Sequence, residues 1–267
     1  VAGLFYREPK LGNPVKFRKM AIFIPGYKED AVITEVAISA LQQQYPMGMY
    51  DVVVIADSFK EETLQILRGL PVKLIEVQFD KSTKSKALNR AMETLKIPYD
   101  IAVVLDADNI MASDFLAKIN AAFDKGYIAV QGHRRAKNLN NSWAILDAAS
   151  EEINNHIFRK GHRAAGLSSA IIGSGMAFEY GFFKSMMSQV HAVGGFDKEI
   201  ELKMLKERIK IAYLDDAMVY DEKIQEADVF GNQRRRWLSA QFHYFRPYEQ
   251  ISRSEIFRTL RIFCKEN

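Results

Sequence analysis

The hydrophobic residues of the first half alternate between short apolar runs and longer stretches with helical spacing. Residues 31–44, 60–68 and 84–95 are predicted helices, with apolar side chains three or four positions apart where the spacing is clearest. Between them lie continuous runs rich in β-branched residues, as is typical of buried strands: 20–25, 51–56, 72–77 and 101–105. This alternation predicts an α/β fold with a mostly parallel sheet and helices on both faces.

The second half has a less regular pattern. We expect strands at 127–131, 211–214 and 218–220, and helices at 115–123, 143–159, 199–208 and 229–245. The small-residue stretch 171–178 fits either a strand or a loop. No repeat, linker or low-complexity tract divides the chain, so we predict one domain over residues 1–267.

Composition narrows the class of protein. The chain is 48% hydrophobic and 26% charged, which is ordinary for a globular domain. Its one cysteine, Cys264, excludes an internal disulfide framework or a cysteine-based zinc site. No apolar run reaches the roughly 18 residues that span a bilayer. The chain opens with Val1 rather than Met, and we expect it to be a segment of a longer protein.

An acidic pair follows the fourth apolar run. Asp106 and Asp108 are alternate residues just past 101–105, at the strand end where α/β sheets bind ligands. Carboxylate oxygens there suit Mg²⁺ or Mn²⁺, with phosphates and water completing the coordination. A solvated turn or a helix cap is the alternative. An EF-hand is excluded, because Met111 and Ala117 stand where its glycine and glutamate belong.

Other polar residues stand at similar places. Asp57 ends the second run and could accept hydrogen bonds from a base or ribose, or cap a helix. Lys84 and Lys86 open a helix whose N-terminus favours a diphosphate, unless both are simply solvated. Gly173-Ser174-Gly175 would let a ligand approach the backbone closely, or would form a turn.

Gln233-Arg234-Arg235-Arg236-Trp237 is the densest cationic segment. Arginine forks bind phosphate oxygens, and the indole offers a flat face to a sugar ring. A solvated helix face is the alternative. A nucleic-acid surface is not favoured, since the net charge is only +4, with 33 acidic residues and no broad basic stripe.

In this order, the segments resemble those of processive-type family 2 glycosyltransferases, the group that contains cellulose and hyaluronan synthases. The resemblance runs from about residue 21 to residue 237. In the first half, IPGYKED (24–30) resembles the family's opening IPxYNE segment, Asp57 matches its nucleotide-contacting Asp, and Lys86-Ala87-Leu88-Asn89 resembles its KxxALN segment. Asp106 and Asp108 match its metal-binding DxD motif. In the second half, Gly173, Ser174 and Gly175 resemble the small-residue segment near the acceptor, and Gln233, Arg236 and Trp237 match the QxxRW motif.

This resemblance implies a GT-A fold, with a Rossmann-like sheet binding a nucleotide sugar within about residues 20–130 and an acceptor within about 131–245. It implies inverting transfer from a nucleotide diphosphate sugar, most reasonably a UDP-sugar, to a saccharide or lipid-linked acceptor. The donor residues would be Pro25, Tyr27, Glu29, Asp57, Lys86, Asp106 and Asp108, the last two holding Mg²⁺ or Mn²⁺.

The general base is where the sequence departs from the family. The usual Thr/Glu-Asp dipeptide is absent from residues 194–202. Counting back from 210–214 places Asp197 where the family's catalytic Asp falls, so we rank Asp197 first, Glu199 second and Glu201 third. Because the dipeptide is missing, a catalytically inactive sugar- or nucleotide-binding module is one alternative function. A sugar nucleotidyltransferase is a second alternative, although residues 25–29 lack the glycine-rich basic loop of such enzymes.

The C-terminal segment predicts contact with a membrane. Residues 253–263 place Ile256, Phe257, Leu260 and Phe263 on one side of a helix, flanked by arginines. Such a helix can lie in a bilayer interface, or pack on the domain as an ordinary helix. With the family resemblance, this predicts a protein anchored by segments outside this chain, on the cytoplasmic face of the membrane.

Overall fold

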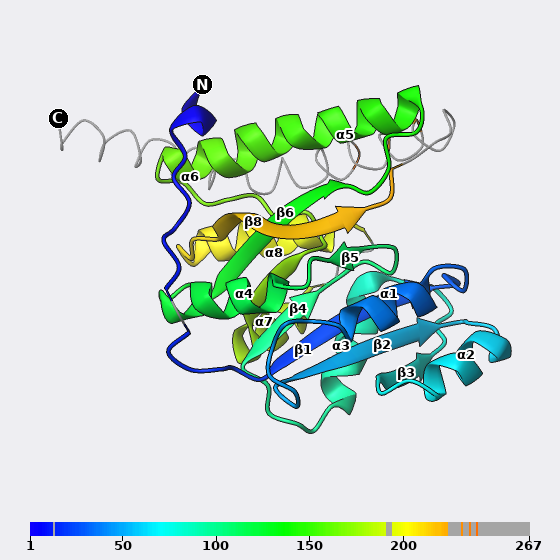
Figure 1. The fold of residues 1–267 in the computed structure, drawn as a ribbon. Coiled ribbons are helices and arrows are strands. Elements are labelled where there is room, and N and C mark those ends of the chain that lie inside the picture. The colour runs from blue at the N-terminus through cyan, green and yellow to red at the C-terminus, as the bar shows by residue number, and fades with distance from the viewer. Residues whose placement is uncertain (13, 191–193, 224–230, 232–234, 236–238, 240–267) are drawn as a thin grey trace.

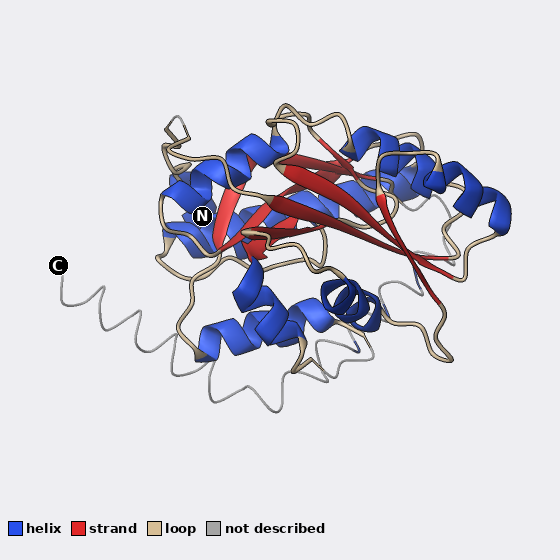
Figure 2. Cartoon of the chain, turned by 90° about the horizontal axis from the view of Figure 1, so that it is seen from below, coloured by secondary structure: helices blue, strands red, loops and turns tan. Residues whose placement is uncertain are grey.

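One eight-stranded sheet lies between two layers of helices (Figures 1 and 2). The computed structural model describes residues 1–12, 14–190, 194–223, 231, 235 and 239. The strand order across the sheet is β3-β2-β1-β4-β7-β6-β8-β5. The mixed α/β fold predicted from the apolar pattern is confirmed.

The first four strands of this order form a parallel unit. They are β1 (Met20–Tyr27), β2 (Tyr50–Asp57), β3 (Lys73–Val77) and β4 (Ile101–Val104), and these four strands pair with one another only in parallel. The connecting helices are α1 (Ile33–Ala40), α2 (Glu61–Arg68) and α3 (Lys84–Thr94). The carboxyl ends of these strands therefore lie at one edge of the sheet, as expected for the parallel arrangement that the apolar runs predicted.

The other half of the sheet is mixed. The strand β7 (Met176–Glu179) is antiparallel to β4 and to β6 (Ala129–Ala136), whereas β8 (Ala212–Asp221) is parallel to β6. The two short strands expected near 211–220 are one strand, whose pairing with β6 is irregular beside Gly132. The short strand β5 (Ile110–Met111) was not predicted, because two residues carry no periodicity.

The helices of the second half divide between the two faces. Helices α1 and α4 (Phe115–Asp124) pack on one face of the sheet, while α3, α7 (Tyr180–Met187) and α8 (Phe196–Lys206) pack on the other. Each face of the sheet has its own hydrophobic core, and alternate residues of β1 point to opposite faces: Ile22 lies in the first core and Phe23 in the second. The helix α7 was not predicted, since it follows β7 without a turn signal.

A long helix crosses the upper edge of the molecule in Figure 1. It consists of α5 (Ser142–Asn154), the π-helical turn η2 (Asn155–Gly161) and α6 (His162–Ala164). The prediction of a helix over 143–159 is confirmed. None of the helices that the structure describes is long and apolar enough to cross a bilayer. The helix predicted at 229–245 lies almost wholly outside the described residues, and the interfacial helix at 253–263 lies entirely outside them.

The N-terminal segment is fixed against β8 by polar contacts. After the 3₁₀ turn η1 (Ala2–Phe5), Glu8 accepts the backbone N–H of Asp215 at 2.9 Å. The Asp215 carboxylate in turn contacts His133 at 3.0 Å and Lys160 at 2.8 Å. Because the other ring nitrogen of His133 meets Glu152 at 3.0 Å, the imidazole joins β6, α5 and β8.

This contact set predicts a pH-dependent stability. Burial disfavours the charged imidazole, but the bonds to Asp215 and Glu152 outweigh it and raise the pKa of His133 to about 9. Its stabilising effect is therefore complete below its ordinary pKa of about 6.5 and is lost as the pH rises through about 9. We expect the free energy of unfolding to fall from about pH 7 to pH 10 by more in the wild-type protein than in His133→Gln, as measured by urea unfolding. Parallel curves for the two proteins would contradict this assignment.

Candidate functional site

The acidic loop after β4 is fixed from both sides. The backbone N–H of Asp106 donates to Ser174 Oγ at 2.9 Å, and that hydroxyl donates to Asn109 Oδ1 at 2.6 Å. Asn109 is completely buried, and its amide donates to Asp108 Oδ1 and Asp221 Oδ1, each at 2.8 Å. The loop is thus held between the segment before β7 and the end of β8.

Negative charge is concentrated around this loop. Burial, followed by the charges of Asp106 and Asp221, raises the pKa of Asp108 to about 6. Burial and the charge of Asp106 also raise the pKa of Glu29, which follows β1. A hard divalent cation fits such a set of oxygens, because it would neutralise this excess charge. No group of three or more metal-binding side chains occurs among the described residues, so further ligands would have to come from phosphates and water.

Lys84 provides the cation nearest to the loop. It is the first residue of α3, and its ammonium group bonds to the Asp106 carboxylate and, at 2.8 Å, to the carbonyl of Gly173. Lys86, the lysine assigned to the donor, instead donates to the carbonyl of Lys81 at 2.9 Å. Lys84 and Lys86 have different partners because side chains two residues apart are rotated by about 200° around the helix axis and so lie on nearly opposite sides.

The Gly173-Ser174-Gly175 segment supports the acidic loop. Gly173 and Gly175 have φ values of +80° and +62°, in the left-handed region that favours glycine. A β-carbon on Gly175 would lie 2.9 Å from Val219 Cγ2, which is too close for a side chain. With both glycines, the segment can bring Ser174 to the acidic loop and Gly173 beside Asp197.

The three candidate bases on α8 face different surroundings. Asp197 lies against Gly173, and burial raises the pKa of its carboxyl while the nearby charges of Lys198 and Lys84 oppose that rise. Glu199 pairs with Lys203 at 2.8 Å. Glu201 accepts the N–H of Ile171 at 3.0 Å and bonds to Lys198. Of the three, Asp197 is therefore the one that lies beside Gly173, whose carbonyl accepts from Lys84.

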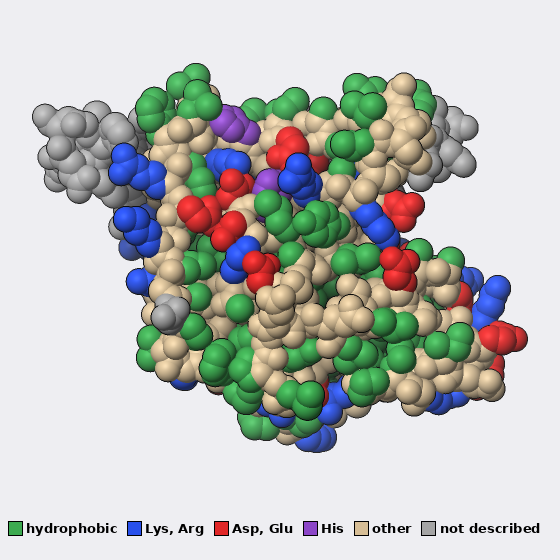
Figure 3. Space-filling view, viewed as in Figure 1, with side chains coloured by type: hydrophobic (Ala, Val, Ile, Leu, Met, Phe, Trp, Pro, Cys, Tyr) green, Lys and Arg blue, Asp and Glu red, His purple; other side chains and the backbone are tan. Residues whose placement is uncertain are grey.

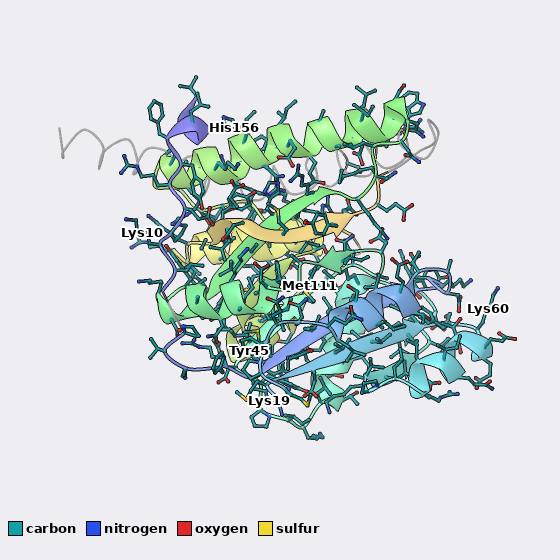
Figure 4. All side chains as sticks on the ribbon, viewed as in Figure 1. Lys10, Lys19, Tyr45, Lys60, Met111 and His156 are labelled. Carbon is teal, nitrogen blue, oxygen red and sulfur yellow. The ribbon has the colours of Figure 1, made fainter. Side chains whose placement is uncertain are left out.

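The ends of β1 and β2 form the adjoining part of this edge. Asp57 is only 2% exposed and accepts the hydroxyl of Ser58 at 3.0 Å, whereas Tyr27, paired with it in the sheet, is 51% exposed. Pro25 lies within β1 two residues earlier. An open depression begins here, at the end of the sheet near Lys60 in Figure 4. Its lining residues are Lys28, Asp30, Ala31, Ser58, Lys60, Glu62 and Thr63.

A buried ion network lies behind the acidic loop. Asp221 Oδ2 meets Lys223 Nζ at 2.7 Å, and the same ammonium meets Glu151 at 2.7 Å. Glu151 also binds Arg134 at 2.9 Å, and these two cations outweigh burial and lower the pKa of Glu151 to about 2. The sequence analysis missed these residues, although the consecutive arginines Arg134 and Arg135 near the end of β6 were a usable signal.

The site thus brings together many of the residues chosen from the sequence. Ser174 bonds to Asp106 directly and to Asp108 through Asn109, a residue that the sequence analysis did not select, with Lys84, Gly173 and Asp197 alongside. Lys86, Glu199 and Glu201 bond to partners elsewhere. Gln233, Arg236 and Trp237 lie outside the described residues.

This arrangement agrees with the comparison against known families. Residues 18–240 match the model described as "Glycosyltransferase like family 2". The match spans most of the chain, and the protein belongs to this family.

Two curated relatives show low sequence identity to this chain. The chain is 23% identical over 236 residues to the beta-monoglucosyldiacylglycerol synthases of Trichormus variabilis and of a Nostoc species, which covers 86% of this chain and 50% of each relative. The chain therefore spans about half the length of the curated relatives it matches.

Solved structures confirm the GT-A type of fold. A Pyrobaculum calidifontis mannosyltransferase, solved with GDP-Man and Mn²⁺, gives a TM-score of 0.68 at 18% identity, covering 94% of this chain and 73% of that one. The Mycobacterium tuberculosis glucosyl-3-phosphoglycerate synthase with Mn²⁺, UDP and its product gives 0.53 at 14% identity, covering 82% and 76%. S. aureus TarS with UDP-GlcNAc gives 0.54 at 16% identity, covering 78% and 59%.

The buried amide of Asn109 leads to a prediction about stability. Asn109→Ala would leave the buried oxygens of Asp108 and Asp221 without this donor, and should lower the free energy of unfolding by about 1–3 kcal/mol. Chemical unfolding at neutral pH measures this loss. Gln42→Ala, at an exposed position, is the control and should change stability by less than about 0.5 kcal/mol. Equal effects of the two substitutions would show that Asn109 does not support the loop.

Proposed function

We propose that this chain is the catalytic domain of an inverting, metal-dependent glycosyltransferase. It transfers a sugar from a nucleotide diphosphate sugar, most reasonably a UDP-sugar, to a saccharide or lipid-linked acceptor. The observation that carries this proposal is the acidic loop of Asp106 and Asp108 at the carboxyl end of a parallel sheet, with Lys84 and Asp197 beside it. Similar structures solved with nucleotides or nucleotide sugars support it.

The nucleotide of the donor would lie over the ends of β1 and β2. Pro25, Tyr27 and Glu29 would line the base and ribose, and Asp57 would accept hydrogen bonds from them. The backbone favours such a role, because Lys28 and Ser58 hold left-handed conformations with φ of +56° and +59° at these two strand ends. Non-glycine residues in that region are uncommon and cluster at functional sites.

The diphosphate would lie between Asp106, Asp108 and Lys84. The two carboxylates would hold Mg²⁺ or Mn²⁺, which supplies charge neutralisation to the leaving group when bound. Lys84 would exchange its contact with Asp106 for a phosphate oxygen, since an ammonium group binds either anion. By the family resemblance, Arg236 would add to this charge stabilisation, and Gln233 and Trp237 would contribute to the acceptor end.

Asp197 would act as the general base. Its carboxylate would take the proton of the acceptor hydroxyl while the acceptor oxygen attacks the anomeric carbon and the nucleotide diphosphate departs from the opposite face. A single displacement of this kind inverts the configuration and needs no covalent intermediate. The raised pKa of Asp197 suits a base, because a pKa nearer the working pH favours proton transfer.

The acceptor and the location follow from the relatives. The names of the curated relatives specify a glucosyl diacylglycerol product, which favours a lipid acceptor here. The whole protein would then be anchored by segments outside this chain at the cytoplasmic face of a membrane, with 253–263 as an interfacial helix. The assignment to the processive synthase type depends on Gln233, Arg236 and Trp237.

Turnover without metal tests the donor site. Removal of divalent ions with EDTA should abolish release of nucleotide from a UDP-sugar panel, and Mn²⁺ or Mg²⁺ should restore it. Asp108→Ala should lose metal-dependent UDP binding, measured by calorimetry, because one metal ligand is gone. Glu93→Ala, at the exposed far end of α3 from Lys84, is the acidic control and should bind normally. Full activity in EDTA would refute metal dependence, and release of pyrophosphate instead would indicate a nucleotidyltransferase.

Substitution of the base tests the chemistry separately. Asp197→Asn should reduce kcat by about 10²–10⁴-fold and leave the Kd for UDP nearly unchanged, because the base acts on the acceptor. Glu199→Gln and Glu201→Gln serve as matched controls on the same helix and should retain most of the activity. Loss confined to either control would move the base to that residue. No turnover by the wild-type protein with any donor, despite binding, would favour an inactive module.

A further inference from the structure

The long helix α5–η2 has its polarity reversed. Its buried positions include Asp147 and Glu151 in α5, and Asn155 and Arg159 in η2. Its exposed positions between 142 and 158 are almost all apolar or small: Ser142, Trp143, Ile145, Leu146, Ala149, Glu152, Ile153, Ile157 and Phe158. A helix on the surface of a soluble domain normally shows the opposite arrangement.

The buried polar face is explained by the ion network, but the exposed apolar face is not. Leu146, Ile153 and Ile157 are 55%, 57% and 49% exposed, and follow one another at helical spacing. The stretch from Trp143 to Phe158 is about 22 Å long at about 1.5 Å per residue. Contiguous exposed apolar surface of this length marks an interaction site.

A second segment extends this ridge. The turn η1 packs against η2, with Gly3 so close to His156 that a β-carbon would lie 2.5 Å from its carbonyl oxygen. Leu4 and Phe5 of this turn are among the exposed apolar residues. In Figure 3 apolar side chains follow the upper edge of the molecule, above a band of charged ones, and Figure 4 shows His156 at the end where η1 lies.

We propose that this ridge, formed by α5, η2 and η1, rests on the surface of an anionic lipid bilayer. Glu152 is the one charged residue among the exposed positions of 142–158, and it is already paired with His133. The exposed cation Arg7 follows η1 at the end of the ridge and complements anionic headgroups, whereas Figure 4 shows Lys10 farther along the N-terminal segment, below the long helix. The ridge lies on an outer edge rather than in a groove, and a straight apolar helix edge with a cation at one end fits a planar interface.

This contact does not depend on the chemistry of sugar transfer. The ridge lies within the described domain and is separate from the predicted interfacial segment at 253–263. Because α5 follows the carboxyl end of β6, its first turn lies toward the edge of the sheet that carries the acidic loop. A lipid acceptor held in the same bilayer would thus approach the domain from this side.

Vesicle partitioning of the full chain tests the ridge. Leu146→Gln, Ile153→Gln and Ile157→Gln combined should lower the partition coefficient at least tenfold on vesicles of phosphatidylcholine and phosphatidylglycerol mixed two to one. The matched control combines Ile38→Gln, Met47→Gln and Ile66→Gln, which are exposed apolar residues away from the ridge, and should partition like the wild type. Circular dichroism and UDP binding in solution should remain unchanged in both, which separates loss of the surface from misfolding and from failure of the donor site.

Fluorescence gives an independent measure of insertion. Trp143 and Trp237 are the two tryptophans of the chain, so Trp237→Phe leaves Trp143 as the single reporter on the ridge. Brominated phosphatidylcholine in the same vesicles should quench its emission. Equal partitioning of the two triple variants, or bound protein without quenching, would overturn the proposal. A wild-type dimer that becomes a monomer in the ridge variant would also overturn it, by assigning the surface to a second copy.

Discussion

The balance of charge around the loop from Asp106 to Asn109 is the constraint on which the rest of the structure depends. Asp106, Asp108 and Asp221 lie at one edge of the sheet, and isolated carboxylates are costly to bury. Lys84 compensates from α3, and Lys223 compensates from the end of β8. Asn109 joins the two sides by donating to both Asp108 and Asp221. Each half of the sheet therefore neutralises its own carboxylates, and the amide of Asn109 holds the two halves together.

The same balance explains why the long helix is inverted. Glu151 must face inward because Arg134 and Lys223 lie beneath it. With these polar side chains facing the interior, most of the exposed positions on the outer side of the helix are apolar. The ridge is thus linked to the acidic loop through the amide of Asn109 and the ion pairs of Lys223 with Asp221 and Glu151.

Local patterns predicted the first half of the fold well. Buried parallel strands such as 20–25 and 101–105 are continuous apolar runs, and the acidic pair stands directly after one of them. The sequence was less informative where contacts join distant segments. Asp221 and Asn109 are separated by more than a hundred positions, and nothing in their neighbourhoods indicates that they bond. The sequence analysis assigned Lys86 to the donor site, whereas Lys84 is the lysine that contacts Asp106. A sequence motif gives the spacing of residues, but the rotation of the helix about its axis decides which lysine faces the loop.

Ser174 shows what this construction means for the arrival of a ligand. Its hydroxyl accepts from the backbone of Asp106 and donates to Asn109, so the loop has its shape before any cation or nucleotide is present. The loop therefore loses its conformational entropy when the protein folds, and not when a ligand binds. Donor capture would then require little rearrangement beyond the ammonium of Lys84, and its rate should be governed by diffusion and charge rather than by the closing of this loop.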